Sequence, residues 1–193
     1  MTEYIDPEFF TGDTLTVARN LLGTKLTFRD CEGIIVETEA YKDDPASHAV
    51  TKPQKGLMLK ETYGHIYVFF VYGMYYCLNF TTEKHGTGAV LIRAIEPTAG
   101  LGHMKKRRCT DKIHNLTNGP GKLFQAFGLD PKLHGEIVGR SVKLMPNRNV
   151  SESEIVTGPR IGVSKAADLP WRFSIKDNPF VSHSKHRTST TSR

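Results

Sequence analysis

Short runs in which hydrophobic and polar residues alternate recur along the first half of the chain and indicate β-strands. Lys25 to Phe28 and Gly33 to Tyr41 are two such runs, and the turn-like cluster between them predicts a hairpin. His65 to Phe80 is a long aromatic run with a break at Tyr72-Gly73-Met74, which predicts two more strands. Further strands are expected at Ala89 to Ile95, Ser141 to Leu144, Glu154 to Val156 and Arg172 to Ile175.

Three segments have the spacing or the end signals of helices. The first is capped by Asp13 or Thr14 and ends at Gly23, where a left-handed residue is favoured. The second is the basic segment Met104 to Arg108. The third begins near Pro120, and its apolar residues follow a 3.6-residue period.

Together these elements predict an α+β fold. We expect a single compact domain over residues 1–181, with a mainly antiparallel, curved β-sheet core flanked by short helices. Residues 182–193 are mostly Ser, Thr, His and basic residues with almost nothing to bury, so we expect a mobile tail there.

Composition narrows the class of protein. The chain is 38% hydrophobic, which excludes a disordered protein, and no stretch approaches the roughly 18 apolar residues of a membrane helix. Glu3 and Asp6 near the start do not fit a secretory signal, so we expect an intracellular protein, in the cytoplasm or nucleoid of a bacterium or the nucleus of a eukaryote. Cys31, Cys77 and Cys109 form no CxxC pair, which argues against a disulfide framework and a zinc knuckle.

The formal net charge is +6, which suits a polyanionic partner. Gly119-Pro120-Gly121-Lys122 opens a predicted helix, where free amides and a lysine would make an anion site. The basic run Lys105 to Arg108 is either a solvated helix face or a further anion contact. Neither GxxxxGK[ST] nor GxGxxG occurs, which disfavours nucleotide-triphosphate hydrolysis and a nicotinamide cofactor.

Two carboxylates share one face of a predicted strand. Alternation puts Glu37, Glu39 and Tyr41 on the same side. The ordinary explanation is a solvated strand face. The alternative is that one carboxylate is a general base beside an aromatic platform, with His48 contributed by the following loop.

Aromatic residues are concentrated between Tyr63 and Tyr76. The consecutive pairs Phe69-Phe70 and Tyr75-Tyr76 must point to opposite faces of their strands, so some of these rings face a cleft or a ligand. Aromatic faces near basic residues are typical of nucleobase stacking. Tyr72, just before Gly73, is expected to project from a turn as a wedge.

Several ordered motifs resemble one known family, the alkyladenine (3-methyladenine) DNA glycosylases of the mammalian type, which also occur in bacteria. The resemblance extends from Arg19 to Val181. Its most specific segments are VETEAY at 36–41, YGMYYCLN at 72–79, LIRAIEP at 91–97, GPGKL at 119–123 and RIGV at 160–163.

The resemblance implies a monofunctional enzyme that flips a damaged purine out of double-stranded DNA and hydrolyses its N-glycosidic bond. It implies no metal, no organic cofactor and no membrane, and we expect a monomer. Glu39 falls on the general base, Arg93 on a residue that helps to hold the attacking water, and Ile161 on a residue whose carbonyl contacts that water.

The resemblance also assigns the residues that would bind DNA. Tyr72 falls on the side chain inserted into the duplex, and Lys122 resembles a phosphate contact. The base pocket would be formed by Tyr41, His48, Phe69 and Asn79. The family often has Tyr in place of Phe69, so the stacking face is kept and a hydroxyl is lost.

Two other functions remain open on the residues themselves. The first is a non-enzymatic nucleic-acid-binding module that uses the same aromatic rings and lysines. The second is a carbohydrate hydrolase that uses Glu37 and Glu39, although two carboxylates on one strand face lie on one side of a bond rather than bracketing it.

Overall fold

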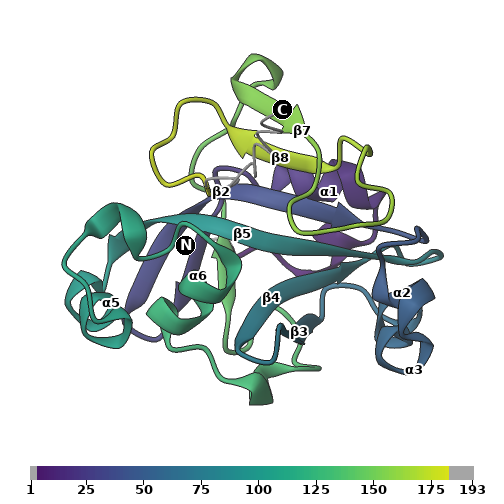
Figure 1. The fold of residues 1–193 in the computed structure, drawn as a ribbon, viewed down its shortest axis with the longest axis horizontal. Helices are drawn as coiled ribbons and strands as arrows, with labels where there is room; N and C mark the ends of the chain where they lie inside the picture. Colours follow the sequence, from purple (N-terminus) through teal and green to yellow (C-terminus); the bar gives the residue numbers. More distant parts are fainter. Residues whose placement is uncertain (1–3, 183–193) are drawn as a thin grey trace, which may run out of the picture.

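The longest strands, β2 (Cys31–Tyr41) and β5 (Gly88–Ala99), pair at the centre of an antiparallel sheet (Figure 1). The structure, a computed structural model, describes residues 4–182. The strand order is β3-β4-β5-β2-β1-β6, and β8 pairs with both β2 and β7. The other strands are β1 (Lys25–Phe28), β3 (Ile66–Val71), β4 (Tyr75–Thr82), β6 (Lys143–Met145), β7 (Ile155–Gly158) and β8 (Arg172–Ile175). The fold is therefore α+β with a mainly antiparallel sheet, which confirms the sequence prediction.

The second half of β2 is buried on both faces. On one face, the Thr38 hydroxyl donates a 2.9 Å hydrogen bond to the Ala18 carbonyl of α1 (Thr14–Asn20). On the other face, Glu37 and Glu39 have 0% exposed surface, because the segments around Ile161 and Ser182 cover them. The expectation of a solvated polar face on this strand is wrong.

The β2–β5 pair contains a β-bulge at Arg93. Glu37 pairs with Ala94 and Thr38 with Ile92, so Arg93 has no opposite residue on β2. A bulge of this kind turns a side chain out of the regular ladder, and such bulges are common beside active sites. This bulge places Arg93 next to the buried carboxylates.

The helices are short and lie around the sheet (Figure 1). Helix α1 follows the capping residue Asp13, which accepts a hydrogen bond from the Thr16 N–H, as the sequence predicts. Three helices of four residues each between positions 48 and 61 are not expected from the sequence, because one turn has no hydrophobic period. The remaining helices are α2 (His48–Thr51), α3 (Pro53–Gly56), α4 (Met58–Glu61), α5 (Leu101–Arg108) and α6 (Pro120–Phe127), with 3-10 turns η1 (Pro7–Phe10), η2 (Ile113–Asn115), η3 (Pro131–Leu133) and η4 (Glu152–Glu154).

Part of the basic run in α5 joins this helix to α6. Arg107 donates to the Ala126 carbonyl at 3.0 Å, and Arg108 bonds the Gln125 side chain at 2.5 Å. Helix α6 buries its apolar side against the sheet, including Leu123. The first turn of α6 is thereby held beside β4.

The β3–β4 hairpin ends in a tight turn that presents Tyr72. Tyr72 and Gly73 have φ values of 53° and 64°, and the Met74 N–H donates to the Val71 carbonyl at 3.2 Å. Positive φ at two successive positions matches the twist of a hairpin. Tyr72 is 74% exposed at the tip, as expected for a projecting residue.

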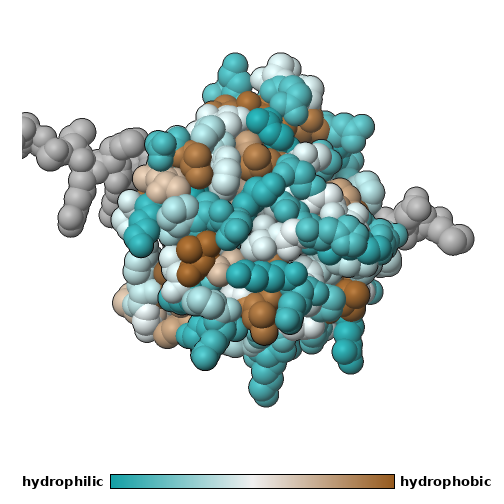
Figure 2. All heavy atoms as spheres, turned by 90° about the vertical axis from the view of Figure 1, so that its right-hand side faces the viewer, coloured by the Kyte–Doolittle hydropathy of each residue, from teal (hydrophilic) through white to brown (hydrophobic). Residues whose placement is uncertain are grey.

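Hydrophilic residues cover most of the face that carries α2 and α3, with hydrophobic residues in small separate groups (Figure 2). Within residues 4–182, no helix has the length and apolar character needed to cross a bilayer. The tail expected at residues 182–193 lies outside the described residues except for Ser182, which is buried against Glu37.

Candidate active site

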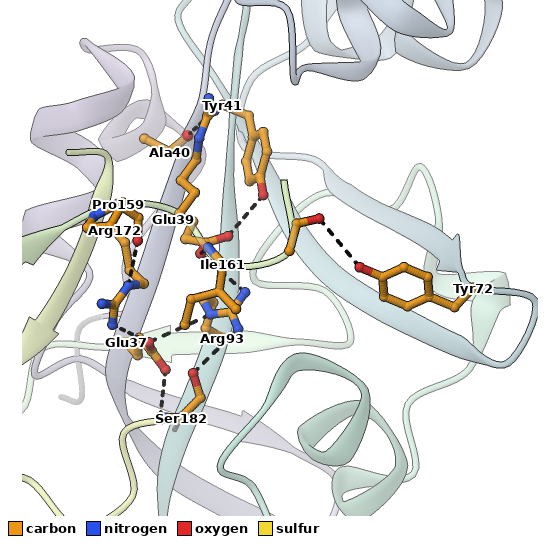
Figure 3. Close-up of polar contacts among 12 residues, drawn as sticks. Glu37, Glu39, Ala40, Tyr41, Tyr72, Arg93, Pro159, Ile161, Arg172 and Ser182 are labelled. Atoms are coloured by element: carbon orange, nitrogen blue, oxygen red, sulfur yellow. Dashed lines mark hydrogen bonds and ion pairs between the residues drawn. The ribbon is translucent and has the colours of Figure 1, made fainter. Parts of the chain in front are cut away.

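Glu39 is a buried carboxylate with three hydrogen-bonding or ionic partners (Figure 3). Its Oε1 accepts from the Ile161 N–H at 2.7 Å and lies 3.2 Å from Arg93 Nη1. Its Oε2 accepts from the Tyr41 hydroxyl at 2.9 Å. Three of the residues predicted from the sequence therefore meet at Glu39, with Ile161 acting here through its amide rather than its carbonyl.

Burial and these donors act on the proton affinity of Glu39 in opposite directions. Burial raises the pKa of Glu39, whereas Arg93, the Ile161 amide and the Tyr41 hydroxyl oppose the rise. The pKa of Glu39 remains above its ordinary value. Burial and the Glu39 charge raise the pKa of Tyr41 well above 10, so Tyr41 stays a neutral donor. A carboxylate of raised pKa is suited to accept a proton near neutral pH.

Glu37 holds the other side of Arg93. Its Oε1 lies 3.7 Å from Arg93 Nε and accepts from Arg172 Nη1 at 3.0 Å. Its Oε2 accepts from the Ser182 N–H at 2.8 Å, and the Ser182 hydroxyl lies 3.4 Å from Arg93 Nη2. Buried charges persist only where they are paired in this way. Glu37 is therefore hydrogen-bonded to Arg172 and the Ser182 amide and forms a longer ion pair with Arg93.

A cavity of about 390 Å³ opens in front of this cluster. All the site residues predicted from the sequence line it except Glu39 and Lys122. Glu39 is bonded to three of the lining residues. The lining residues are Tyr41, Pro45, Ala46, His48, Thr51, Leu59, Tyr67, Phe69, Val71, Tyr72, Cys77, Asn79, Ala89, Leu91, Arg93, Pro120, Ile161, Gly162, Val163, Ser164 and Lys165.

One wall of the cavity is aromatic and uncharged. The His48 and Phe69 ring centroids lie 3.9 Å apart in an edge-to-face arrangement. His48 Nδ1 is hydrogen-bonded to the Tyr67 hydroxyl at 2.9 Å. Burial, with smaller effects from Lys52 and Lys55, lowers the pKa of His48 to about 4, so this side chain is neutral at physiological pH.

Asn79 forms part of the floor of the cavity. Its amide nitrogen donates to the Tyr67 carbonyl at 2.9 Å, which fixes the side chain. Only 7% of Asn79 is exposed. A rigid polar side chain at this depth can exclude bases whose shape or hydrogen-bonding groups do not match.

Tyr72 and Lys122 lie at the edges of the site. The Tyr72 hydroxyl donates a long 3.5 Å hydrogen bond to the Gly162 carbonyl (Figure 3), and both residues line the cavity. Lys122 is in the first turn of α6, and its Nζ donates to Asn118 at 2.8 Å. Lys122 does not line the cavity, although its neighbour Pro120 does.

Several functional residues escape sequence reasoning. Pro45, Ala46 and the residues at 163–165 line the cavity from irregular loops, for which no periodicity exists. Buried Arg160 and Asp44 connect these loops. Arg160 is the first residue of the RIGV motif, whereas Asp44 lies in none of the motifs. Among residues 4–182, no group of three His, Cys, Asp or Glu side chains is arranged to hold a metal ion.

The site thus brings together a buried acid, an arginine paired with it and an aromatic cavity. The family model of methylpurine-DNA glycosylase (MPG) matches residues 8–179. A protein of Prosthecochloris aestuarii named "Putative 3-methyladenine DNA glycosylase" is 47% identical over 186 residues, covering 91% of this chain and 89% of its own. Proteins of the same name from Rhizobium johnstonii and Agrobacterium fabrum are 44% and 43% identical, covering 91% and 94% of this chain and 87% and 96% of their own.

The chain therefore belongs to the methylpurine-DNA glycosylase family. It is a DNA glycosylase, an enzyme of DNA repair, and DNA is its substrate.

Proposed function

We propose that this protein is a monofunctional glycosylase that releases damaged purines from double-stranded DNA as a monomer, without a metal or organic cofactor. The target nucleotide is flipped from the duplex into the cavity, and Glu39 activates the water that hydrolyses its N-glycosidic bond. The observation that carries this proposal is the buried Glu39 carboxylate, bonded to three residues that line an aromatic cavity of about 390 Å³.

In this mechanism Glu39 accepts a proton from water as the water oxygen bonds to C1′ of the sugar. The bond from C1′ to the purine nitrogen breaks, and its electron pair leaves with the base. The carboxylate also stabilises the positive charge that develops on the sugar. Arg93 and the Ile161 carbonyl would hold the water beside Glu39, and the positive charge of Arg93 favours the ionised form of the carboxylate.

The aromatic wall would bind the flipped base. Tyr41, His48 and Phe69 present rings to the cavity, and stacking on such rings is worth roughly 1–3 kcal/mol per base. Alkylated purines that carry positive charge gain a further cation–π attraction of order 1 kcal/mol. Asn79 on the cavity floor would crowd the amino group of a normal guanine.

Tyr72 would fill the gap that the flipped nucleotide leaves in the duplex. Its exposed position at the hairpin tip and its place at the mouth of the cavity support this role. Lys122 at the start of α6 would contact a phosphate, since helix amides and a lysine attract anions there.

The burial of the acid argues against the two other candidate functions. A binding module gains nothing from enclosing a carboxylate and an arginine, because desolvating charges costs several kcal/mol per ion. A carbohydrate hydrolase needs two carboxylates on either side of a bond, whereas Glu37 is occupied by Arg172 and Ser182 behind the cavity wall.

The test uses a duplex oligonucleotide with a single hypoxanthine. The proposal expects an abasic site, detected as strand cleavage only after alkaline treatment, which also establishes monofunctional action. Strand cleavage without alkali would contradict the monofunctional assignment. Intact strands after alkaline treatment, with duplexes containing 7-methylguanine and ethenoadenine equally unaffected, would overturn the proposal.

A further inference from the structure

Arg160 lies directly behind the cavity wall formed by Tyr41. Its side chain has 0% exposed surface, and its Cζ lies 4.7 Å from the centroid of the Tyr41 ring and 5.0 Å from that of Trp171. Tyr41 lines the cavity, whereas Arg160 and Trp171 do not. The guanidinium therefore packs on the side of the Tyr41 ring that faces away from the cavity.

The same guanidinium joins three segments of the chain. Its two terminal nitrogens donate to the two carboxylate oxygens of Asp44 at 2.8 and 3.1 Å. It also donates to the Ala40 carbonyl of β2 at 3.1 Å and to the Ala166 carbonyl at 3.3 Å. Asp44 in turn accepts from the Lys42 and Ala46 amides, which folds the 42–47 loop around it.

Both loops tied by Arg160 supply residues of the cavity lining, and the loop that follows Arg160 also supplies a partner of Glu39. The 42–47 loop contributes Pro45 and Ala46 to the cavity lining, and the loop that follows Arg160 contributes residues 161–165. Ile161, next to Arg160, donates its amide to Glu39, and Tyr41, under the guanidinium, donates its hydroxyl. Two of the three partners of Glu39 are thus adjacent to one buried arginine.

We propose that Arg160, paired with Asp44, is a positioning residue that holds Tyr41 and Ile161 in place around Glu39. It touches neither Glu39 nor the cavity and acts through these two residues. The planar shape of the guanidinium is essential here, because it bonds Asp44 through two parallel donors and at the same time packs against the rings of Tyr41 and Trp171. The ammonium group of a lysine is a point charge and cannot do both. This inference rests on the proposed function, since its effect is defined on the hydrolysis that Glu39 performs.

The experiment compares single-turnover release of hypoxanthine from one duplex across a range of pH. The variants are Arg160→Lys, Tyr41→Phe and the double variant. The matched control is Arg19→Lys, because Arg19 also stacks on a ring, that of Phe173 at 4.5 Å, and bonds a carboxylate, that of Glu152 at 2.8 Å, away from the cavity. Thermal unfolding of every variant measures the purely structural effect.

We expect Arg160→Lys to lower the maximal rate by about tenfold to a hundredfold, the loss typical of a misplaced catalytic group. We also expect the acidic limb of its pH profile to move to higher pH, because a displaced Tyr41 hydroxyl no longer lowers the pKa of Glu39. Tyr41→Phe should move the acidic limb in the same direction. In the double variant the two effects should be less than additive, because both changes weaken the Tyr41–Glu39 hydrogen bond, and any further shift reports the Ile161 amide. Arg19→Lys should leave the acidic limb in place.

A merely structural role predicts a different pattern. Arg160→Lys would then reduce thermal stability while its acidic limb stayed at the wild-type pH, or its effect would add fully to that of Tyr41→Phe, and either result would overturn the inference. If Arg160→Lys does not fold, Asp44→Asn is the second variant, because it weakens the paired hydrogen bonds to Arg160 while keeping the shape of the side chain. The acidic limb of Asp44→Asn must then also move to higher pH. A wild-type protein that releases no base contradicts the proposed function instead, so the two failures are distinguishable.

Discussion

Arg93 Nη1 lies 3.2 Å from Glu39 Oε1, although Arg93 is opposite no residue of β2. The bulge in β5 inserts Arg93 between the pairs Glu37↔Ala94 and Thr38↔Ile92, so the guanidinium reaches both carboxylates of the neighbouring strand. A regular ladder would give one residue of β5 for each residue of β2. The bulge is therefore the feature of the backbone that gives one cation two buried carboxylate partners.

The hydrogen bond from Tyr41 to Glu39 predicts a specific pH dependence. Base release requires ionised Glu39, so the rate falls as the pH drops through the raised pKa of this residue. Tyr41→Phe removes a donor that favours the ionised form, which raises that pKa further. The acidic limb of the single-turnover pH profile should move to higher pH. A limb that moves to lower pH, or does not move, would show that Tyr41 does not stabilise the charge on Glu39.

His48 should not contribute to that profile in the physiological range. Its pKa, lowered to about 4, keeps the ring neutral at every pH above about 5. His48→Gln preserves a polar side chain and removes the titration. An unperturbed histidine titrates between roughly pH 5.5 and 8. In this range we expect the pH profile of the variant to keep its shape, even if the rate falls. The loss of a titration step there would contradict a neutral His48.

Tyr72→Ala should lower excision from well-paired DNA by the equivalent of a few kcal/mol or less, the free energy associated with one unstacked base step. Tyr72 contributes only where stacked base pairs must be held apart. Glu39 lies on β2 and Arg93 on β5, so the substitution leaves both in place. Single-turnover excision of hypoxanthine opposite thymine should therefore suffer more than excision opposite a mismatched base. Equal losses on both substrates, with folding verified by circular dichroism, would assign Tyr72 to the base pocket.

Binding to undamaged duplex should weaken steeply with salt. The logarithm of the binding constant falls linearly with the logarithm of the salt concentration, with a slope of about −0.9 for each phosphate neutralised. Lys122→Ala should make that slope shallower by about one unit. Arg108→Ala is a suitable comparison, because it removes one positive charge from the end of α5, whereas Lys122 is in the first turn of α6, close to Pro120 of the cavity lining. We expect a smaller change for Arg108→Ala. An unchanged slope for Lys122→Ala would remove Lys122 from the DNA interface.

The sequence predicts the elements of this fold that are long or have a clear period. The hairpin of β1 and β2, the start of α1 and the turn at Tyr72 follow from alternation, capping and glycine preference, and all are confirmed. Strand β5 continues past the expected end at Ile95 to Ala99. Pro97 lies within this extension and pairs with Gly33, whose missing Cβ allows the close approach.

The surroundings of the site could be predicted only in part. Alternation in β2 correctly puts Glu37, Glu39 and Tyr41 together, but it cannot reveal that distant loops bury this face. Those loops are held by contacts far apart in sequence, such as Arg160 with Asp44. The family resemblance supplied the candidate residues, and the structure adds their spatial order around Glu39.

The most direct test compares Glu39→Gln with Glu37→Gln, two neighbouring buried carboxylates that differ in their partners. Glu39 bonds Tyr41, Arg93 and Ile161, which line the cavity, whereas Glu37 hydrogen-bonds Arg172 and Ser182, which do not. Both variants are assayed for binding to a hypoxanthine duplex and for base release under single-turnover conditions. We predict that Glu39→Gln binds the duplex and releases no base, because an amide cannot accept the proton of water. We predict a much milder loss for Glu37→Gln, which still offers an acceptor to the Ser182 amide. Continued base release by Glu39→Gln, with Glu37→Gln inactive, would contradict the assignment of Glu39 as the base.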